Sequence, residues 1–438
     1  MKTIIKIFLI GLVAGLVYKY MVEKEIDIAE KSDVAIEWIK DKIESLSDLS
    51  AEDISNENAG SKEEVEDTGN YTGHSYSPMS TMNPASKETR PVKTHAEESK
   101  KHHDNHGVDI SGAIEYRIME KDQSNILELR SLDSYAKNTP AEYENSIPDL
   151  AEYFAGHASN DMEKARLIFT WVATHIAYDA HGFNTGYYAG SSAEEVLNNR
   201  VSVCEGYSNL LVALGNAAGI KTIKIDGSAK GIGYRYGKKT AGNNHAWNAM
   251  MVNGKWRLLD ATWAAGYGKA VNGKLVSVMQ FDDYWFDTAP EEFIFTHLPA
   301  TAKWQLLRIP VTRACFEEMP YASSDYFKLG FNGKQCFKKV MNGSIRSLPE
   351  TFSIDHRVKL ISMPAQGVIK SGTAVKLRLK ADNVSRVALK NNDEWLYFEK
   401  KEDEYALVTV PRKGKMKLMA NFKGDGLPFH TILKYTVE

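Results

Sequence analysis

The sequence predicts an α+β protein in which a cysteine-bearing helix packs on an antiparallel sheet, followed by a small all-β domain. Two observations predict the first part. Cys204 opens a segment with helical apolar spacing, and Asn253-Gly254 separates two strand-like runs. The third observation is a series of short strand-like runs between turn signals from Val358 onward, which is typical of an all-β domain.

The cysteine lies at the predicted start of a helix. Ser202 and Glu205 have the spacing of a capping box, in which Ser202 is the N-cap and Glu205 reaches back to it. Apolar residues then recur at helical spacing, and Gly219 fits the end of the helix. Cys204 therefore falls in the first turn, where unpaired N–H groups and the helix dipole favour a thiolate. A buried structural cysteine is the alternative, because free cysteine is often buried.

A hairpin is predicted from residues 245–252 and 255–262, which flank an Asn-Gly turn. In that register Trp247 faces Asp260, and His245 shares the face of Trp247 because strand side chains alternate. His245 and Asp260 are then diagonal neighbours within side-chain reach of each other. The carboxylate can fix the imidazole tautomer, and the imidazole can take the proton of a thiol.

Cys204, His245 and Asp260 are therefore the candidate catalytic residues: a nucleophile, its base and the carboxylate that orients the base. The alternative is a structural His–Asp pair in the core that performs no catalysis. The cysteine at a helix start upstream favours the triad over that alternative. We predict no cofactor and no metal ligand at this site.

These segments resemble the transglutaminase-like superfamily, over roughly Leu132 to Ile309. The motifs occur in the family's order: Arg166-Leu-Ile-Phe-Thr-Trp171, Ala193-Glu-Glu-Val-Leu, Val203-Cys204-Glu-Gly-Tyr-Ser, the His245 and Asp260 segments, and Phe293-Ile-Phe-Thr-His297-Leu-Pro. They point to the branch that includes the kyphoscoliosis peptidase and its bacterial relatives. The resemblance implies a papain-like α+β core and a Cys204/His245/Asp260 triad.

A thiolate with a histidine can form a thioester from an amide carbonyl, after which water gives hydrolysis and an amine gives crosslinking. We favour a cysteine peptidase or amidase acting on protein or peptide amides, because the branch is described as peptidase-like. A protein-crosslinking transglutaminase is the alternative within the same chemistry. A non-catalytic protein- or cell-wall-binding module is the alternative of another class, since the family contains members that have lost activity.

Two loops rich in glycine and tyrosine, residues 179–192 and 228–243, are expected to border the cleft. The oxyanion hole should use the backbone N–H of Cys204, and the sequence names no second donor. The second loop is basic through Lys230, Arg235, Lys238 and Lys239.

The N-terminal residues predict a signal anchor or transmembrane segment. Residues 1–22 combine a basic start with an apolar run of about 17 residues, the short limit for spanning a bilayer, and no small-residue cleavage site follows. The basic flank puts the catalytic domain outside the cytoplasm, which in a bacterium is the periplasm or the cell surface. A peripheral hydrophobic helix on the cytoplasmic side is the alternative.

Residues 23–49 carry a loose helical stripe of apolar residues, which suits a membrane surface or a partner helix. A frayed, solvated helix is the equal alternative. Residues 50–107 are rich in Ser, Glu, Asn, Lys and Gly, and they predict a disordered tether. The tether contains several histidines, for which we favour a solvated polar run over a weak metal site.

The remainder divides into a transglutaminase-like catalytic domain at 108–310, a connector at 311–345 and an Ig-like β-sandwich at 346–438. The sandwich is either a binding or positioning module or a purely structural one. Its strand-like runs are Val375–Leu379, Ser385–Leu389, Trp395–Phe398, Tyr405–Val410, Met416–Ala420 and Thr431–Tyr435.

Composition and cysteine count bound the partners of the chain. The 438 residues carry a formal net charge of −3. No basic patch with interleaved aromatic residues is present in the sequence, so we predict a protein or peptide substrate and no nucleic acid. With Cys204 as the nucleophile, Cys315 and Cys336 remain as a candidate disulfide pair in an oxidising compartment. The oligomeric state is open.

Overall fold

The computed structural model describes residues 113–115, 128–231, 234, 237–240, 242–353, 358–423 and 428–438. The chain divides into the units Met1–Tyr71 and Thr72–Glu438, and all described residues belong to the second. The predicted anchor at 1–22, the helix at 23–49 and the tether at 50–107 lie outside the described residues. Within the described ranges, every helix is too short or too polar to cross a bilayer.

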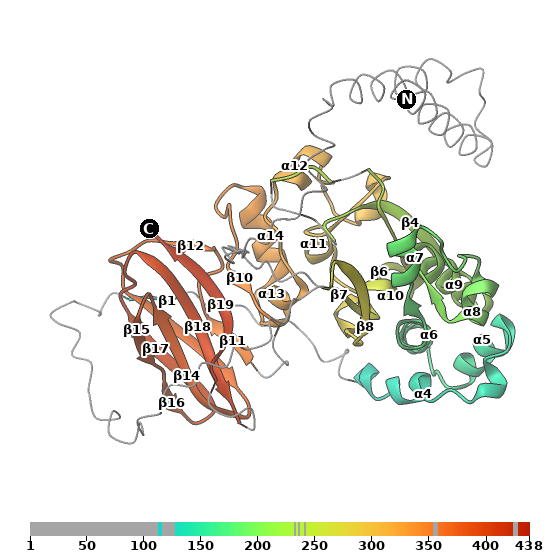
Figure 1. Ribbon diagram of the computed structural model, residues 1–438, viewed down its shortest axis with the longest axis horizontal. Coiled ribbons are helices and arrows are strands. Elements are labelled where there is room, and N and C mark those ends of the chain that lie inside the picture. Colours follow the sequence, from blue (N-terminus) through green and yellow to red (C-terminus); the bar gives the residue numbers. More distant parts are fainter. Residues whose placement is uncertain are drawn as a thin grey trace, which may run out of the picture. The chain divides into compact units, whose positions relative to one another are not determined.

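A four-stranded antiparallel sheet with the strand order β6-β5-β4-β9 forms the centre of the first core (Figure 1). The Asn253 and Gly254 turn joins β5 to β6 with φ values of 51° and 70°, and Val252 pairs with Lys255 as the hairpin prediction requires. The strands are β4 (Thr222–Ala229), β5 (His245–Val252), β6 (Lys255–Leu259) and β9 (His297–Pro299).

The second hairpin strand is shorter than the predicted range of 255–262, which is therefore wrong at its end. β6 ends at Leu259, and Asp260 is the N-cap of the short helix α10 (Ala261–Ala264). There its Oδ1 accepts a hydrogen bond from the backbone N–H of Trp263 at 2.9 Å. Aspartate is a preferred N-cap residue, and here that preference outweighs the strand pattern.

Helix α9 (Cys204–Ala217) packs on β5 and β4 through its apolar face. Tyr207, Leu210 and Leu214 on that face are fully buried, and each leucine contributes roughly 1.5–3 kcal/mol by leaving water. The helix ends as predicted, with Gly219 at a φ of 79° just beyond it. The other helices of this region are α4 (Asp133–Lys137), α5 (Ile147–Gly156), α6 (Asp161–His175), α7 (Ala180–Thr185), α8 (Ala193–Asn199) and α11 (Pro290–Phe293).

The predicted capping box of α9 is wrong. Val203 is the N-cap and makes no side-chain capping bond. Ser202 instead donates its hydroxyl to the carbonyl of Gly190 at 2.8 Å, and Glu205 pairs with Lys224. Ser202 is a strand residue and not the N-cap, because it lies in a two-stranded parallel ladder formed by β2 (Ala177–Tyr178) and β3 (Val201–Ser202).

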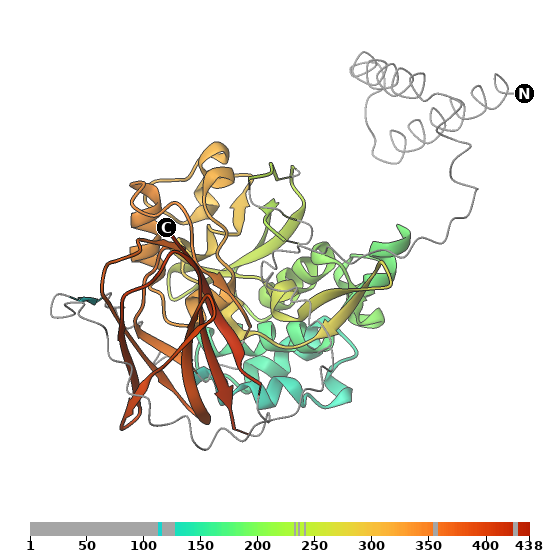
Figure 2. The same cartoon turned by 60° about the vertical axis from the view of Figure 1, so that its left-hand side comes forward.

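A second hairpin, which the sequence analysis did not predict, consists of β7 (Gly266–Val271) and β8 (Lys274–Met279). Its turn is again an Asn-Gly pair with positive φ, so the same sequence signal marks it. Helix α7 lies against β8 (Figure 2). The Asn184 side chain exchanges two hydrogen bonds with the backbone of Leu275, at 2.8 and 2.9 Å.

Two sheets form the β-rich C-terminal region (Figure 1). Alternate residues of β13 are buried, as expected for a strand with one face on a core. All six predicted strand-like runs are strands, while the immunoglobulin-like assignment stays a prediction. One sheet contains β11 (Val358–Ser362), β13 (Val375–Ala381), β16 (Glu399–Lys401) and β17 (Glu404–Thr409), and the other contains β10 (Glu350–Thr351), β12 (Val368–Ile369), β14 (Val384–Asn391), β15 (Glu394–Tyr397), β18 (Gly414–Phe422) and β19 (His430–Val437).

The second core extends beyond the two sheets. It joins residues of both sheets to Ile294, Phe295 and Leu298, which lie before the predicted boundary at 310. It also includes residues of the connector, whose helices are α12 (Arg313–Glu318), α13 (Ser324–Lys328) and α14 (Gly333–Met341).

An early segment of the chain also belongs to the C-terminal sheets. Strand β1 (Ile114–Glu115) pairs in parallel with β13, and Glu115 forms an ion pair with Arg378 at 2.7 Å. These residues fall within the range 108–310 that was predicted as the catalytic domain. Their pairing depends on a partner more than 250 residues away, which no local pattern indicates.

The predicted pairing of Cys315 with Cys336 is not formed, because all three cysteines are free. The Cys315 sulfur faces the sulfur of Met341 at 3.8 Å, and Cys336 is buried beside Tyr326. Burial raises the pKa of Cys336 to about 11 and also raises the pKa of Cys315. Both thiols are therefore poor nucleophiles at neutral pH.

Candidate active site

The structure brings the three predicted site residues together from three elements. Cys204 is the first residue of α9, and its thiol interacts with the ring of His245, the first residue of β5. The Nε2 atom of His245 lies 2.7 Å from Oδ2 of Asp260, the N-cap of α10. Asp260 reaches the histidine from a helix N-terminus and not as the predicted cross-strand neighbour.

The charges of this cluster support one another. Burial alone would raise the pKa of the Cys204 thiol, but the hydrogen bond and charge of His245 outweigh it and hold that pKa below its usual value. Burial alone would lower the pKa of His245, but the carboxylate of Asp260 raises it to about 10. The surroundings therefore favour a thiolate beside an imidazolium, which is the reactive form of a cysteine nucleophile.

Asp260 keeps its charge although it is fully buried. Burial would raise its pKa, but His245, and after it His297, hold that pKa well below its usual range. The backbone N–H of Trp263 adds a third hydrogen-bond donor. A carboxylate with three donors can stay ionised in the interior and fix the histidine ring beside it.

His297, in β9, is a site residue that sequence reasoning did not assign. Its Nε2 lies 3.0 Å from the same Oδ2 atom of Asp260 that contacts His245. Burial lowers the pKa of His297 to about 4, so the ring is neutral at pH 7. His297 lies in one of the sequence motifs that resemble the family. No local spacing predicts its contact with Asp260, because Asp260 lies 37 residues earlier in the chain.

A cleft of about 220 Å³ opens beside Cys204 and His245. Of the two loops expected to border it, 179–192 contributes Phe183 and 228–243 contributes Gly231. The cleft is further lined by Tyr178, Trp263, Tyr267, Ser277 and Met279, among others, so the unpredicted β7–β8 hairpin forms one wall.

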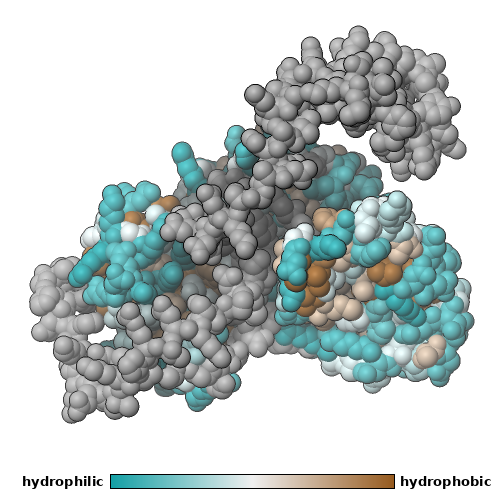
Figure 3. All heavy atoms as spheres, viewed as in Figure 1, coloured by the Kyte–Doolittle hydropathy of each residue, from teal (hydrophilic) through white to brown (hydrophobic). Residues whose placement is uncertain are grey.

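Large apolar side chains are exposed near this cleft. Phe183 in the first loop is 46% exposed and Met279 at the end of β8 is 49% exposed, and both line the cleft. Figure 3 shows apolar residues on the surface in the region of β7 and β8. Exposed apolar groups beside a reactive cysteine fit contact with a protein or peptide chain.

The second loop is less basic at its surface than the sequence suggested. Lys238 and Lys239 are exposed, but Lys230 is fully buried and donates to the carbonyl of Met319 at 2.9 Å. Burial lowers the pKa of Lys230 to about 7. Arg235 lies outside the described residues.

One group in the described part of the chain has the composition of a metal site. His245, Asp260 and His297 offer ligand atoms that all lie within 4.8 Å of one another. The two N–O distances of 2.7 and 3.0 Å are those of N–H···O hydrogen bonds, which account for the arrangement. Beside Cys204, this cluster can orient and charge a catalytic histidine without an ion.

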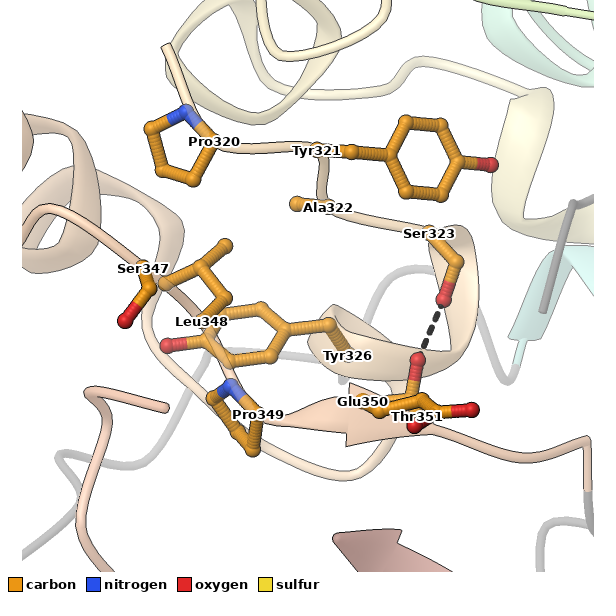
Figure 4. A pocket seen from close by; sticks show the side chains of 10 residues that line it. All are labelled: Pro320, Tyr321, Ala322, Ser323, Tyr326, Ser347, Leu348, Pro349, Glu350 and Thr351. Atoms are coloured by element: carbon orange, nitrogen blue, oxygen red, sulfur yellow. Dashed lines mark hydrogen bonds between the residues drawn. The ribbon is translucent and has the colours of Figure 1, made fainter. Parts of the chain in front are cut away.

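A second cavity of about 130 Å³ lies between the connector and the start of β10 (Figure 4). Ser323 and Thr351 form a 2.7 Å hydrogen bond at its edge, and Tyr326 lines it. The carboxylate of Glu350 in this lining is paired with Lys434 at 2.8 Å. These contacts join the connector to the sheet.

The region that contains these residues resembles known proteins. The family model described as the transglutaminase-like superfamily matches residues 148–261. These residues form a transglutaminase-like domain. Cys204, His245 and Asp260 all lie inside the transglutaminase-like domain, whereas His297 lies beyond its matched end.

Individual relatives share between about a fifth and a third of their aligned residues with the chain. Human kyphoscoliosis peptidase is 25% identical over 313 residues, covering 71% of this chain and 43% of that protein. Hillarin from Drosophila melanogaster is 31% identical over 216 residues, covering 47% of this chain and 26% of that protein. A solved structure of a TGase is 21% identical and covers 33% of this chain and 39% of that chain, with a TM-score of 0.22.

The match spans less than half of the human and mouse kyphoscoliosis peptidases, at 43% and 41% of their lengths. The remaining part of each of those proteins lies outside the match. What they do as whole proteins is therefore not assigned to this chain by the match.

Proposed function

We propose that the chain is a cysteine peptidase or amidase that cleaves amide bonds of proteins or peptides through a thioester on Cys204. The observation that carries this proposal is the Cys204 thiol at a helix start, in contact with His245 beside an open cleft. Asp260, 2.7 Å from His245, keeps the imidazolium charged and oriented. The resulting thiolate is a strong nucleophile at neutral pH.

In the acylation step, the Cys204 thiolate attacks the amide carbonyl and forms a C–S bond. The His245 imidazolium then gives its proton to the leaving nitrogen, the C–N bond breaks, and a thioester remains on Cys204. In deacylation, neutral His245 takes a proton from water while the water oxygen attacks the thioester. The C–S bond breaks, and the thiolate and imidazolium are restored with release of the acid.

Each step forms an oxyanion on the substrate carbonyl that is bonded to Cys204, and this oxyanion needs hydrogen-bond donors beside it. The backbone N–H of Cys204 is the first donor, at the positive end of α9. Tyr178 is the candidate second donor. It lines the same cleft, and burial raises its pKa, so its hydroxyl keeps its proton and can donate.

Transfer of the acyl group to a lysine amine in place of water is the second outcome of the same chemistry. The match of residues 148–261 to the transglutaminase-like superfamily supports this acyl transfer to an amine as a second candidate reaction. A protein or peptide substrate is common to both outcomes, which is consistent with the exposed apolar residues beside the cleft.

The localisation also remains a proposal. Residues 1–22, with their basic start and apolar run, support an anchor in a membrane with the catalytic domain outside the cytoplasm. Protease treatment of intact and lysed cells tests it. Digestion of the domain in intact cells is expected, and protection until lysis would contradict the orientation.

Mass spectrometry of the intact protein with a panel of peptide amides and activated esters tests the function. We expect an acyl adduct on Cys204, absent in Cys204→Ala, and release of the free acid in water. Adding a primary amine such as cadaverine separates the two outcomes, because a transglutaminase would form the amide conjugate in preference to the acid. No adduct and no product with any probe would favour the non-catalytic binding module.

A further inference from the structure

The carboxylate of Asp260 is shared by two histidines. Its Oδ2 atom lies 2.7 Å from Nε2 of His245 and 3.0 Å from Nε2 of His297, while its Oδ1 accepts from the Trp263 backbone. His245 is the first residue of β5, His297 is the first residue of β9, and Asp260 is the N-cap of α10. His297 does not line the cleft, so it cannot touch a substrate directly.

We infer that His297 is a positioning residue of the active site, which holds Asp260 in the orientation that Asp260 needs to orient His245. The inference rests on the proposed roles of Asp260 and His245. It assigns a function to a histidine that lies outside the matched transglutaminase-like domain.

The proton on His297 can be placed from its partners. An ionised carboxylate only accepts hydrogen bonds, so Nε2 of His297 must carry the proton that points at Asp260. Nδ1 lies 2.8 Å from the hydroxyl of Thr296, which can donate to it. A neutral ring with the proton on Nε2 satisfies both contacts, and burial, which lowers the pKa of His297 to about 4, keeps the ring neutral.

Aromatic rings enclose His297 and exclude water from its contact with Asp260. The ring of Phe293 stacks on it with centroids 4.1 Å apart, and the ring of Trp263 lies 4.4 Å away. Trp247 and Trp285 approach edge-on at 5.1 and 5.4 Å. Water therefore cannot replace the hydrogen bond when the imidazole is removed. The Asp260 carboxylate would then lose one of the hydrogen bonds that fix its orientation.

Among the residues that the structure describes, the titratable groups that act on this pair are Cys204 and Tyr207 of α9 and His245 of β5. Burial raises the pKa of Tyr207 far above its usual value, so this tyrosine stays neutral. A change in the pH profile of the thiol after substitution of His297 would therefore be transmitted through Asp260 and His245.

Three variants test the inference. In His297→Gln the side-chain amide can reach the position of Nε2 and still donate to Asp260. In His297→Asn the amide is too short to reach it, and His297→Leu has no donor. The rate of Cys204 alkylation by iodoacetamide is measured against pH in each variant, with thermal unfolding measured in parallel.

We expect His297→Gln to keep the wild-type pH profile. His297→Asn and His297→Leu should slow alkylation at pH 7 by about tenfold or more and move the midpoint towards higher pH. If the leucine variant does not fold, the comparison of His297→Gln with His297→Asn still tests the inference. Both variants place an amide in the pocket of His297, and only the glutamine amide reaches Asp260. A wild-type profile in His297→Asn, or equal losses in the Gln and Asn variants, would overturn the inference. Failure of the proposed function would appear separately, as an ordinary thiol profile in the wild type.

Discussion

At the scale of single residues, Cys204 differs from the other two cysteines in what surrounds each sulfur. His245 and the backbone N–H of Ala246 lower the pKa of Cys204 against the effect of burial. Lys230 lowers the pKa of Cys315, and Tyr326 and Lys339 lower that of Cys336, but for these two thiols burial outweighs the neighbours and the pKa is raised. We therefore expect the same residue type to be a nucleophile at a helix start and an inert thiol elsewhere.

Tyr178 provides a residue-scale prediction. Replacing it by phenylalanine removes the hydroxyl that we assign to the oxyanion, so the kcat for a peptide substrate should fall about tenfold to a hundredfold. The rate of Cys204 alkylation should stay unchanged, because alkylation creates no oxyanion. Tyr187→Phe is the matched control, since this tyrosine is 82% exposed. Equal kcat values in both variants would remove Tyr178 from the oxyanion hole.

The sequence predicted the residues whose signals are local. Cys204 is marked by the helix pattern after it, and His245 with Asp260 by the Asn-Gly turn between them. The details of both predictions changed, because Val203 caps α9 and Asp260 caps α10. The role of His297 could not be predicted, since it depends on β9 pairing with β4, a contact between distant segments.

At the scale of elements, the approach of β9 to β4 sets the position of His297. Gly227 of β4 pairs with Pro299 of β9. A Cβ atom at Gly227 would lie 2.3 Å from the carbonyl oxygen of Leu298 and 2.5 Å from the ring of Trp247. The absence of a side chain at this glycine lets the two strands come together beside the active-site rings.

Gly227→Ala is therefore expected to push β9 away from β4. The free energy of unfolding should fall by about 1–3 kcal/mol, as for overpacked cores, and Cys204 should lose part of its reactivity at pH 7. Gly242→Ala is the control, because a Cβ there meets no atom within 4 Å. Denaturant unfolding and iodoacetamide labelling check both effects. Wild-type behaviour in Gly227→Ala would show that the strand spacing does not control the site.

At the scale of the whole molecule, the second core links the end of the first region to the β-rich sheets. Ile294, Phe295 and Leu298 are buried in it, and Lys230 of the cleft loop donates to Met319 of the connector. The strands of the sheets were predictable from their alternating patterns, but this sharing of one core was not, since it depends on which surfaces meet.

A chain that ends at residue 310 should therefore expose apolar surface and lose cooperative unfolding. Deletion of residues 1–22 should instead leave a soluble, folded protein, because the predicted tether separates the apolar run from the core. Thermal unfolding followed by light scattering compares the two truncations. A cooperative transition in the chain ending at 310 would show that the first region folds without the second core.

The two active-site histidines predict how stability depends on pH. His297 has a folded pKa of about 4 against about 6.5 when unfolded, so the unfolded state binds more protons between these values. Stability should fall by roughly 3 kcal/mol as pH drops from 6.5 to 4, at 1.36 kcal/mol per pKa unit. His245, whose pKa is raised to about 10, stabilises the fold below pH 6.5 and loses that contribution as pH rises to 10.

Denaturant unfolding across pH 4 to 10 should therefore give a maximum near pH 6.5. His297→Gln should flatten the acid side of the curve and leave the alkaline side unchanged, because glutamine does not titrate. An acid limb of the same slope in this variant would contradict the neutral state of His297.

The most direct test of the central claim is the rate of Cys204 alkylation against pH in the wild type and in His245→Ala, with modified cysteines identified by peptide mass spectrometry. In the wild type, Cys204 should react with a midpoint well below about 8.5, the free thiol value, while Cys315 and Cys336 stay unmodified at neutral pH. In His245→Ala, the Cys204 midpoint should rise towards about 8.5 or above. Superimposable curves for the two proteins would contradict the account, because His245 would then not activate the thiol.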